Sequence, residues 1–379
     1  MQIETFSHQR GHGWSKALPA HLDSAETLVL AFAAPAYADD PVEFAELAAA
    51  FPTSRIVGCS SAGEIHSHQV ADDTLVVAVT RFARTQVVMA ACPIAAMSDS
   101  FSTGTRLGAE LAAAAPQLVL VLSDGLAVNG TELVKGLSEA LPKGTMICGG
   151  LAADGDQFER TWVLVGGVPR SGFASAVALS GPLVVGAGSQ GGWDSFGPER
   201  KITRAEGNVL YELDGKPALA LYREYLGELA SDLPASALRF PLAVRDSATA
   251  GTSVVRTILA VDEATQSMTF AGDIPNGGRA RLMRSNNDRL IVGAMRAAVD
   301  ASASLDDQPA LVVAISCVGR RLVLGARTEE ETEATLEALP SGSHQVGFYS
   351  YGEISPGSFA QCEVHNQTMT LTAFREIAA

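Results

Sequence analysis

The chain has 379 residues, of which 47% are hydrophobic and 18% charged, and it carries a formal net charge of −15 with a pI near 4.9. This composition is that of a folded globular protein with room for two or three domains and a sizeable core. The acidic balance argues against nucleic-acid binding and against attachment to an anionic membrane, because both need a basic surface. No apolar run reaches the roughly 18 residues of a membrane-spanning helix.

The cysteine pattern indicates a reducing compartment. Five cysteines are scattered along the chain and none has C-x-x-C spacing, which is not the pattern of a disulfide framework. An apolar stretch at residues 27–38 imitates a secretion signal, but Asp23 and Glu26 precede it where a signal needs basic residues. We therefore expect a strand and a loop there, and a cytoplasmic protein.

Hydrophobic runs, helix caps and breakers predict one unit three times over: strand, helix, strand, Gly-rich loop, further strands. The expected strands are residues 28–32, 55–58, 74–80, 85–91, 118–122, 145–148, 161–165, 173–179, 310–315, 344–347 and 368–374. The expected helices lie between Asp40 and Pro52 and at residues 99–115, 131–141, 288–301 and 328–339, the last opening with a capping box. Residues 74–80 with 85–91, and 161–165 with 173–179, are expected to form hairpins.

The predicted fold class is therefore α/β, with mixed, partly parallel sheets flanked by helices, in two related halves that carry the repeated unit. The first 26 residues, which hold three of the seven histidines, are expected to be a loosely held arm. The expected domains are residues 27–215 and 216–379. A hinge-like region around Gly191 and Gly192, and a helix from Ala218, are expected to connect the halves.

Two of the Gly-rich loops share the sequence G-x-x-S-x-G-E-I, at residues 58–65 and 347–354, and a looser copy lies at residues 149–155. Glycine permits sharp turns that gather backbone N–H groups into a concavity able to bind an anion or a carbonyl group. Ligands in parallel sheets bind beyond the carboxyl ends of the strands, where all three loops are expected. The alternative is that they are only tight turns.

Catalytic and metal motifs are weak. Ser61 and Ser350 lack the G-x-S-x-G of a nucleophile elbow, and the sequence has no nucleotide-binding glycine motif. Cys59 and Cys148 end similar strands and suit either a redox pair or ordinary core packing. Arg320 and Arg321 suit either a ligand carboxylate or a neighbouring acid.

The motifs resemble those of the FIST family. Residues 58–65, 122–125 and 149–152 look like its N-terminal domain, whereas residues 213–219, 347–354 and 365–368 look like its C-terminal domain. The resemblance implies a sensory input module for a small ligand, with amino acids as proposed ligands. Some stand-alone members are haem proteins that sense nitric oxide and act on a histidine kinase or a cyclic-di-GMP enzyme.

These considerations predict a cytoplasmic ligand sensor that passes its state to a partner protein, binding neither nucleic acid nor membrane. The alternative is an enzyme with a Cys or Ser nucleophile, which would need Cys59, Ser61 or Ser350 close to a histidine. If haem b binds, it is held non-covalently, and His365 is the expected axial ligand; the alternative for His365 is a hydrogen-bonded clamp. The residues expected to bind the ligand are Cys59, Ser60, Ser61, Gly63, Glu64, Ser123, Asp124, Gly149, Gly150, Tyr349, Ser350, Tyr351, Glu353, His365 and Asn366.

Overall fold

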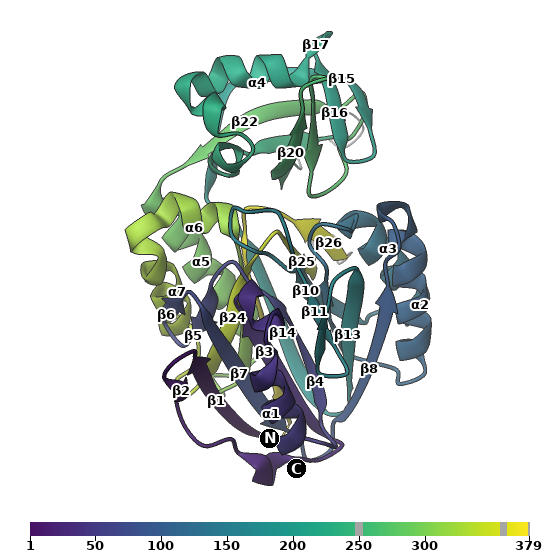
Figure 1. The fold of residues 1–379 in the computed structure, drawn as a ribbon, viewed down its shortest axis with the longest axis vertical. Helices are drawn as coiled ribbons and strands as arrows, with labels where there is room; N and C mark the ends of the chain where they lie inside the picture. The colour runs from purple at the N-terminus through teal and green to yellow at the C-terminus, as the bar shows by residue number, and fades with distance from the viewer. Residues whose placement is uncertain (247–252, 357–361, 378–379) are drawn as a thin grey trace.

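The computed structural model describes residues 1–246, 253–356 and 362–377. The chain forms a large body and a smaller domain that is inserted into it between β14 (Leu183–Gln190) and α5 (Asn287–Ser302). The inserted domain lies above the body in Figure 1. None of the helices in the described residues is long and apolar enough to cross a membrane.

Three mixed sheets build the body, and each contains the same four-strand order. The orders are β4-β3-β7-β1, β10-β9-β13-β8 and β24-β23-β27-β14, in which the first two strands are parallel and the others antiparallel. The bounds are β1 (Gln2–Gln9), β3 (Thr27–Ala33), β4 (Arg55–Ser60), β7 (Thr74–Arg81), β8 (Gln86–Pro93), β9 (Leu118–Ser123), β10 (Met146–Leu151), β13 (Phe173–Ser180), β23 (Leu311–Cys317), β24 (His344–Ser350) and β27 (Met369–Glu376). The predicted α/β class and its repeated unit are confirmed.

The strand that follows each Gly-rich loop leaves its own unit and completes a neighbouring sheet. β5 (Glu64–His66) pairs with β24, β11 (Val163–Val165) pairs with β4, and β25 (Gly352–Pro356) pairs with β10. Each sheet then ends with one more strand, β6 (Gln69–Ala71), β12 (Val168–Arg170) or β26 (Cys362–His365). The three units are therefore interlocked in a cycle.

This exchange makes both expected hairpins wrong, although their strands exist. β7 and β8 lie in different sheets, and so do β11 and β13. Short polar turns of this kind occur both in hairpins and in connections between stacked sheets. The alternation of apolar and polar residues shows that a segment is a strand, but it does not show with which other strand it pairs.

The inner faces of the three sheets meet in one central apolar core. It includes Phe32, Leu120 and Phe348, and the rings of Phe32 and Phe348 stack with centroids 4.8 Å apart. Helices cover the outer faces (Figure 1). They are α1 (Val42–Ala50), α2 (Ser100–Ala112), α3 (Gly130–Ala140), α5 and α7 (Thr328–Glu337).

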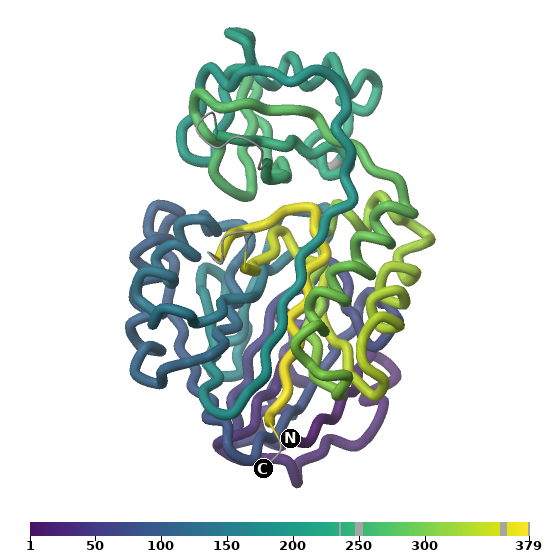
Figure 2. The backbone as a smooth tube through the Cα atoms, turned by 180° about the vertical axis from the view of Figure 1, so that it is seen from behind, coloured from purple at the N-terminus to yellow at the C-terminus, as the bar shows by residue number. Residues whose placement is uncertain are grey.

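The N-terminal segment is not a loosely held arm, so that expectation is wrong. β1 pairs along its whole length with β7, and β2 (Gly13–Trp14) pairs with β1. Phe6 is fully buried, and His8 hydrogen-bonds through Nδ1 to the Tyr37 hydroxyl at 3.1 Å. Both termini lie at the end of the body opposite the inserted domain, where β27 and β14 run side by side (Figure 2).

The inserted domain has its own sheet and its own apolar core. Its elements are β15 (Trp193–Glu206), β16 (Val209–Leu213), β17 (Lys216–Pro217), α4 (Ala218–Leu226), β18 (Leu242–Arg245), β19 (Val254–Arg256), β20 (Ile258–Asp262), β21 (Ser267–Phe270) and β22 (Arg279–Ser285). The helix expected to connect two halves is α4, which packs within this domain. The boundary expected between residues 215 and 216 falls in the turn between β16 and β17, which pair with each other.

A glycine marks the same register position in each parallel strand pair. An ideal Cβ would lie 1.9 Å from the Ala31 oxygen at Gly58, 1.8 Å from the Val121 oxygen at Gly149, and 1.7 Å from the Ala314 oxygen at Gly347. The neighbouring backbone would occupy the space of any side chain. The first glycine of each Gly-rich loop is therefore required by packing of the body.

We expect Gly347→Ala to lower the free energy of unfolding by about 1–3 kcal/mol or more, because the clash is with the backbone of a buried strand that cannot turn aside. Gly130→Ala, at the start of α3, is the control, since its nearest contact is a Val364 methyl carbon 3.1 Å away that can shift. Urea titrations of the two variants test this expectation. Equal stability losses would contradict it.

Candidate functional site

The Gly-rich loops are loop 1 (residues 58–65), loop 2 (residues 149–155) and loop 3 (residues 347–354), and they are joined by a ring of backbone hydrogen bonds. Ala62 N donates to Tyr349 O at 2.9 Å, Ala153 N to Ser60 O at 3.1 Å, and Tyr351 N to Leu151 O at 3.2 Å. Through these three bonds each loop donates to one neighbour and accepts from the other, and Tyr349 N also donates to Gly63 O at 2.9 Å. These four N–H groups are engaged within the protein and are not available to a ligand.

The glutamates of the G-x-x-S-x-G-E-I loops form two equivalent buried clamps. Glu64 Oε2 accepts bonds from Thr74 N at 3.1 Å and from Thr74 Oγ1 at 2.8 Å. Glu353 Oε2 accepts bonds from Thr368 N at 3.2 Å and from Thr368 Oγ1 at 2.9 Å. Burial raises the pKa of both carboxyl groups to about 8. Each clamp ties an exchanged strand back to its own unit.

The second unit has an apolar residue where the first and third units have glutamate. On the exchanged strand of this unit, Val163 pairs with Cys59 of the neighbouring sheet. The equivalent pairs in the other two units are Glu353 with Gly150 and Glu64 with Phe348. Phe173 is the residue just before β13 begins to pair with β9. At the equivalent position the other two units have the threonines of the two clamps. Acid and hydroxyl are replaced together, which avoids leaving a buried polar group unpaired.

The candidate nucleophiles are occupied or buried. Ser61 Oγ donates to Gly63 O at 2.6 Å, and Ser350 Oγ donates to Glu353 Oε1 at 2.6 Å. Cys59 is fully buried, and burial raises the pKa of its thiol. Within the described residues, no hydrogen bond joins Cys59, Ser61 or Ser350 to a histidine. The geometry that the enzyme alternative requires is therefore not found in this part of the chain.

The remaining predicted residues of loops 1 and 2, and those at the end of β9, also face the interior. Ser60 Oγ accepts a bond from Trp162 N, and Ser123 is fully buried. Asp124 accepts bonds from the backbone N–H groups of residues 126, 127 and 172, between 2.8 and 2.9 Å. Gly150 packs against Ile315 and Phe348, with an ideal Cβ 3.0 and 3.1 Å from their side chains.

Tyrosine side chains connect loop 3 to its surroundings. The Tyr351 hydroxyl hydrogen-bonds to Asp154 at the end of loop 2, and its ring stacks on Phe158 with centroids 4.9 Å apart. The Tyr349 hydroxyl donates to Glu331 Oε1 at 3.0 Å. Both rings are buried, so neither presents a free hydroxyl to solvent.

The run His365-Asn366-Gln367-Thr368 fastens the inserted domain to the body. Gln367 Nε2 donates to Leu238 O at 2.8 Å, and Asn366 Oδ1 accepts a bond from Thr257 N at 3.4 Å. In the other direction, Trp193 Nε1 donates to Gln367 O at 2.7 Å. Asn366 therefore lies at the domain interface, where it acts as part of a clamp.

His365 has the donor atom that an iron site needs but lacks the surroundings. Burial and the charge of Arg256 lower its pKa to about 4, so the ring is neutral, and Nε2 is buried without a hydrogen-bond partner. Yet His365 lies in β26, paired with β25, and lines neither of the two large clefts described here. Neither cleft thus has His365 in its lining, and haem ligation by His365 stays a prediction.

A cleft of about 620 Å³, here called the Arg321 cleft, opens beside the ring of loops, between the body and the inserted domain. It lies next to α6 (Val318–Leu324), a short helix after β23 that was not among the expected helices. The spacing of Val318 and Leu322, four residues apart and therefore on one helical face, is the signal that would have identified it. The lining residues are Ala62, Val70, Asp72, Gly155, Asp156, Arg239, Val318, Arg321, Leu322, Gly325, Ala326, Thr328 and Glu329.

The predicted site residues thus adjoin this cleft rather than line it. From the loops, only Ala62 and Gly155 reach it. The larger cleft, of about 880 Å³, lies beside α3 and β10 and is bordered by Arg256 and Cys362.

Arg321 forms one wall of the Arg321 cleft. Its guanidinium donates to both carboxylate oxygens of Asp72 at 2.7 Å and to Ala62 O at 2.5 Å, and it lies 5.5 Å from the centroid of the Tyr349 ring. An ideal Cβ on Gly63 would lie 2.6 Å from Arg321 Nη1. The glycine of loop 1 thus makes room for the arginine.

Arg239 contributes a second cation from the inserted domain. It is exposed and makes no hydrogen bond or ion pair with any other described residue. Asp156, across the cleft, is also exposed. The cleft therefore offers an unpaired guanidinium from the inserted domain and an exposed carboxylate, that of Asp156, from the body.

The buried clamps predict a pH dependence of stability. Because the pKa of Glu64 is about 8 in the folded protein and near 4.5 when unfolded, the folded state retains a proton that the unfolded state releases between these values. The contribution of this bound proton to the free energy of unfolding is complete below about pH 4.5 and is lost as the pH rises to about 8. Stability should fall over this range.

We expect Glu64→Gln to flatten that pH dependence, since an amide oxygen can still accept both bonds from Thr74 but does not titrate. Urea unfolding at several pH values between 5 and 8.5 measures the slope. Glu353→Gln should flatten it further in the double variant. Identical slopes in wild type and both variants would show that these carboxyl groups are ionised in the folded protein.

Two domain families match the chain. The FIST N domain matches residues 27–216 and the FIST C domain matches residues 218–356. An uncharacterized protein of Mycobacterium tuberculosis, from strains CDC 1551 and H37Rv, is 28% identical over 255 residues, which are 64% of this chain and 64% of the relative. An uncharacterized protein of Methanocaldococcus jannaschii is 25% identical over 236 residues, which are 55% of this chain and 44% of the relative. The domain matches cover most of the chain, which belongs to the FIST family, whose domains are associated with sensing in signal transduction.

Proposed function

We propose that the protein is a sensor that binds a small zwitterion, of which a free amino acid is the simplest kind, in the Arg321 cleft. The observation that supports this most strongly is Arg239, an exposed guanidinium that has no acceptor among the described residues and lines a cleft of about 620 Å³ from the inserted domain. An unpaired arginine in a concave site is suited to a carboxylate, which it can hold through two parallel hydrogen bonds.

The charges of the opposite wall fit the other end of such a ligand. Asp156 and Glu329 place carboxylates in the same cleft, where an ammonium group would find acceptors. Arg321 is already bonded to Asp72 and Ala62, so it acts as a wall of the site. A ligand with a carboxylate and an amine is favoured over a plain anion, because a plain anion would meet these acids unpaired.

Ligand binding at this place would act on the arrangement of the two domains. Arg239 belongs to the inserted domain, and the other charged residues of the cleft belong to the body. A ligand held by both sides favours arrangements in which they are close, and it shifts the equilibrium only as far as its affinities for the two arrangements differ. A partner protein that distinguishes them would read the signal.

The role proposed is therefore binding rather than catalysis, in the cytoplasm, with a signalling enzyme as partner. A histidine kinase or a cyclic-di-GMP enzyme is the partner class that the family resemblance implies. The bonded serines and the buried thiol of Cys59 support this role.

We expect Arg239→Gln to weaken binding of the best amino acid by at least about tenfold, the loss typical of a hydrogen bond to a charged group. Isothermal titration calorimetry against the twenty common amino acids identifies the ligand and measures the loss. Arg296→Gln is the control, because Arg296 is an exposed arginine on α5 outside the cleft. Equal affinities in wild type and Arg239→Gln would place the ligand elsewhere.

Haemin provides a second test of the ligand. Because no described cleft reaches His365, we expect haemin to give the same Soret spectrum with wild type and His365→Ala. His344→Ala controls for nonspecific histidine binding. A Soret band lost only in His365→Ala would instead favour a haem sensor.

A further inference from the structure

Three successive residues of helix α6 contact the cleft, the inserted domain and the linkers between the domains. Arg321 lines the Arg321 cleft, and Gly319 faces the inserted domain, where an ideal Cβ would lie 2.6 Å from Leu238 O. Arg320 points to the linkers. We propose that α6 couples occupancy of the cleft to the position of the inserted domain, with Arg320 as the positioning residue. This regulatory role rests on the proposed function.

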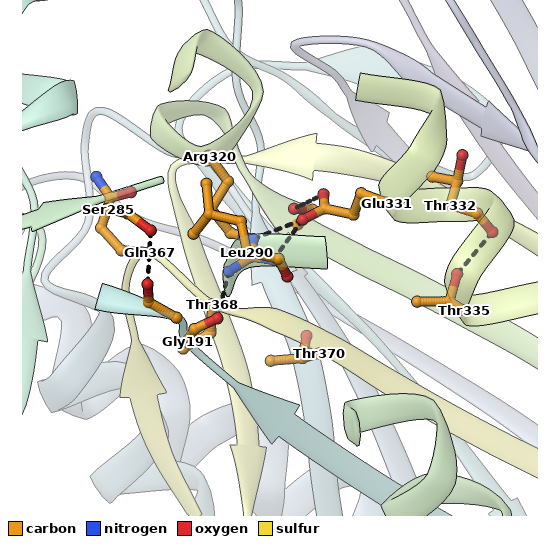
Figure 3. Close-up of polar contacts among 12 residues, drawn as sticks. Gly191, Ser285, Leu290, Arg320, Glu331, Thr332, Thr335, Gln367, Thr368 and Thr370 are labelled. Carbon is orange, nitrogen blue, oxygen red and sulfur yellow. Dashed lines mark hydrogen bonds and ion pairs between the residues drawn. The ribbon is translucent and has the colours of Figure 1, made fainter. Parts of the chain in front are cut away.

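Arg320 holds both linkers of the inserted domain from inside the body. Nη1 donates to Gly191 O at 2.7 Å, just before β15, and Nη2 donates to Leu290 O at 2.8 Å, in the first turn of α5 after β22 (Figure 3). Ser285 Oγ donates to Gly192 O at 2.5 Å and joins the linkers directly. A shift of Arg320 therefore moves the attachment points of both linkers together.

The charge of Arg320 is compensated by one buried acid. Arg320 Nε donates to Glu331 Oε2 at 2.8 Å, and neither side chain is exposed to solvent. Removing either partner would leave a buried charge, which is strongly unfavourable. Arg320 and Glu331 are thus expected to stay together, so that α6 moves together with α7 and with the linker carbonyl groups that Arg320 bonds.

A second route connects the same pair to the cleft. Glu331 Oε1 accepts bonds from Ser316 Oγ at 2.8 Å and from the Tyr349 hydroxyl at 3.0 Å. The face of the Tyr349 ring lies under Arg321, and Tyr349 O closes one bond of the ring of loops. Arg321 and Arg320 are therefore linked through α6 and through Tyr349, so a ligand that shifts the Arg321–Asp72 pair in the wall of the cleft would also shift the linkers.

The test uses the full-length protein and needs no ligand. Asp72→Asn weakens the Arg321–Asp72 pair in the cleft, and hydrogen–deuterium exchange by mass spectrometry follows the amides of residues 190–195 and 284–290. We expect exchange at the linkers to change by about fivefold or more, the lower end of typical coupling between sites. Asp39→Asn is the matched control, because it removes the Asp39–Arg160 pair on the body, away from the linkers.

A double-mutant cycle separates coupling from simple loosening. Arg320→Lys keeps the buried positive charge but has one nitrogen in place of the three that bond Gly191 O, Leu290 O and Glu331, so Asp72→Asn should have little further effect in that background. If Asp72→Asn leaves the linkers unchanged, or if its effect is the same with and without Arg320→Lys, the proposal is wrong.

Glu331→Gln replaces Arg320→Lys in the cycle if the lysine variant does not fold. The outcome is independent of the amino-acid titration: a coupled cleft that binds no amino acid would overturn the proposed ligand, whereas a ligand that binds without coupling to the linkers would overturn only the role of α6.

Discussion

The ring of hydrogen bonds among the three Gly-rich loops is the constraint on which the body depends. It forms because each chain segment, after its loop, crosses to a neighbouring sheet rather than folding back. No unit can complete its own sheet, so the three units are expected to be stable only together. The glycines follow from this arrangement: at Gly58, Gly149 and Gly347 the neighbouring strand comes too close for any side chain.

The G-x-x-S-x-G-E-I pattern is thus explained to a large extent by architecture. Its first glycine allows close packing, its serine closes a turn or bonds the glutamate, and its glutamate clamps an exchanged strand. The second unit supports this account because Val163 and Phe173 replace acid and hydroxyl together. A repeated polar motif at strand ends therefore has a structural explanation that is sufficient without a ligand.

The sequence predicted the helices and most strands of the three units, because buried β-strands and capped amphipathic helices have strong local patterns. It missed β1 and β14, which form the fourth strand of the first and third units. It did not predict which strand pairs with which, since exchange between units depends on contacts distant in sequence. It also missed that residues 193–285 form one inserted domain, because β22 returns to the body without a composition shift. The buried loops were identified, whereas the cleft beside them was not: Asp72, Arg239 and Arg321 are brought together only by the fold.

The features proposed to carry function lie where the third unit departs from the other two. Between its parallel strands the first unit has a short 3-10 helix, η2 (Pro35–Ala38), before α1, and the second has the turn capped by Asp124 before α3. In the third unit the same place is taken by α6, before α7. Likewise β8 leads to α2 through residues 94–99, whereas β14 leads to α5 only through the whole inserted domain. Both departures meet at Arg320, whose side chain spans from α6 to the linkers. Helix α6 and the inserted domain, which have no counterpart in the other two units, lie against each other. Because the three units of the body are interlocked, we expect movement to be confined to the contact between α6 and the inserted domain.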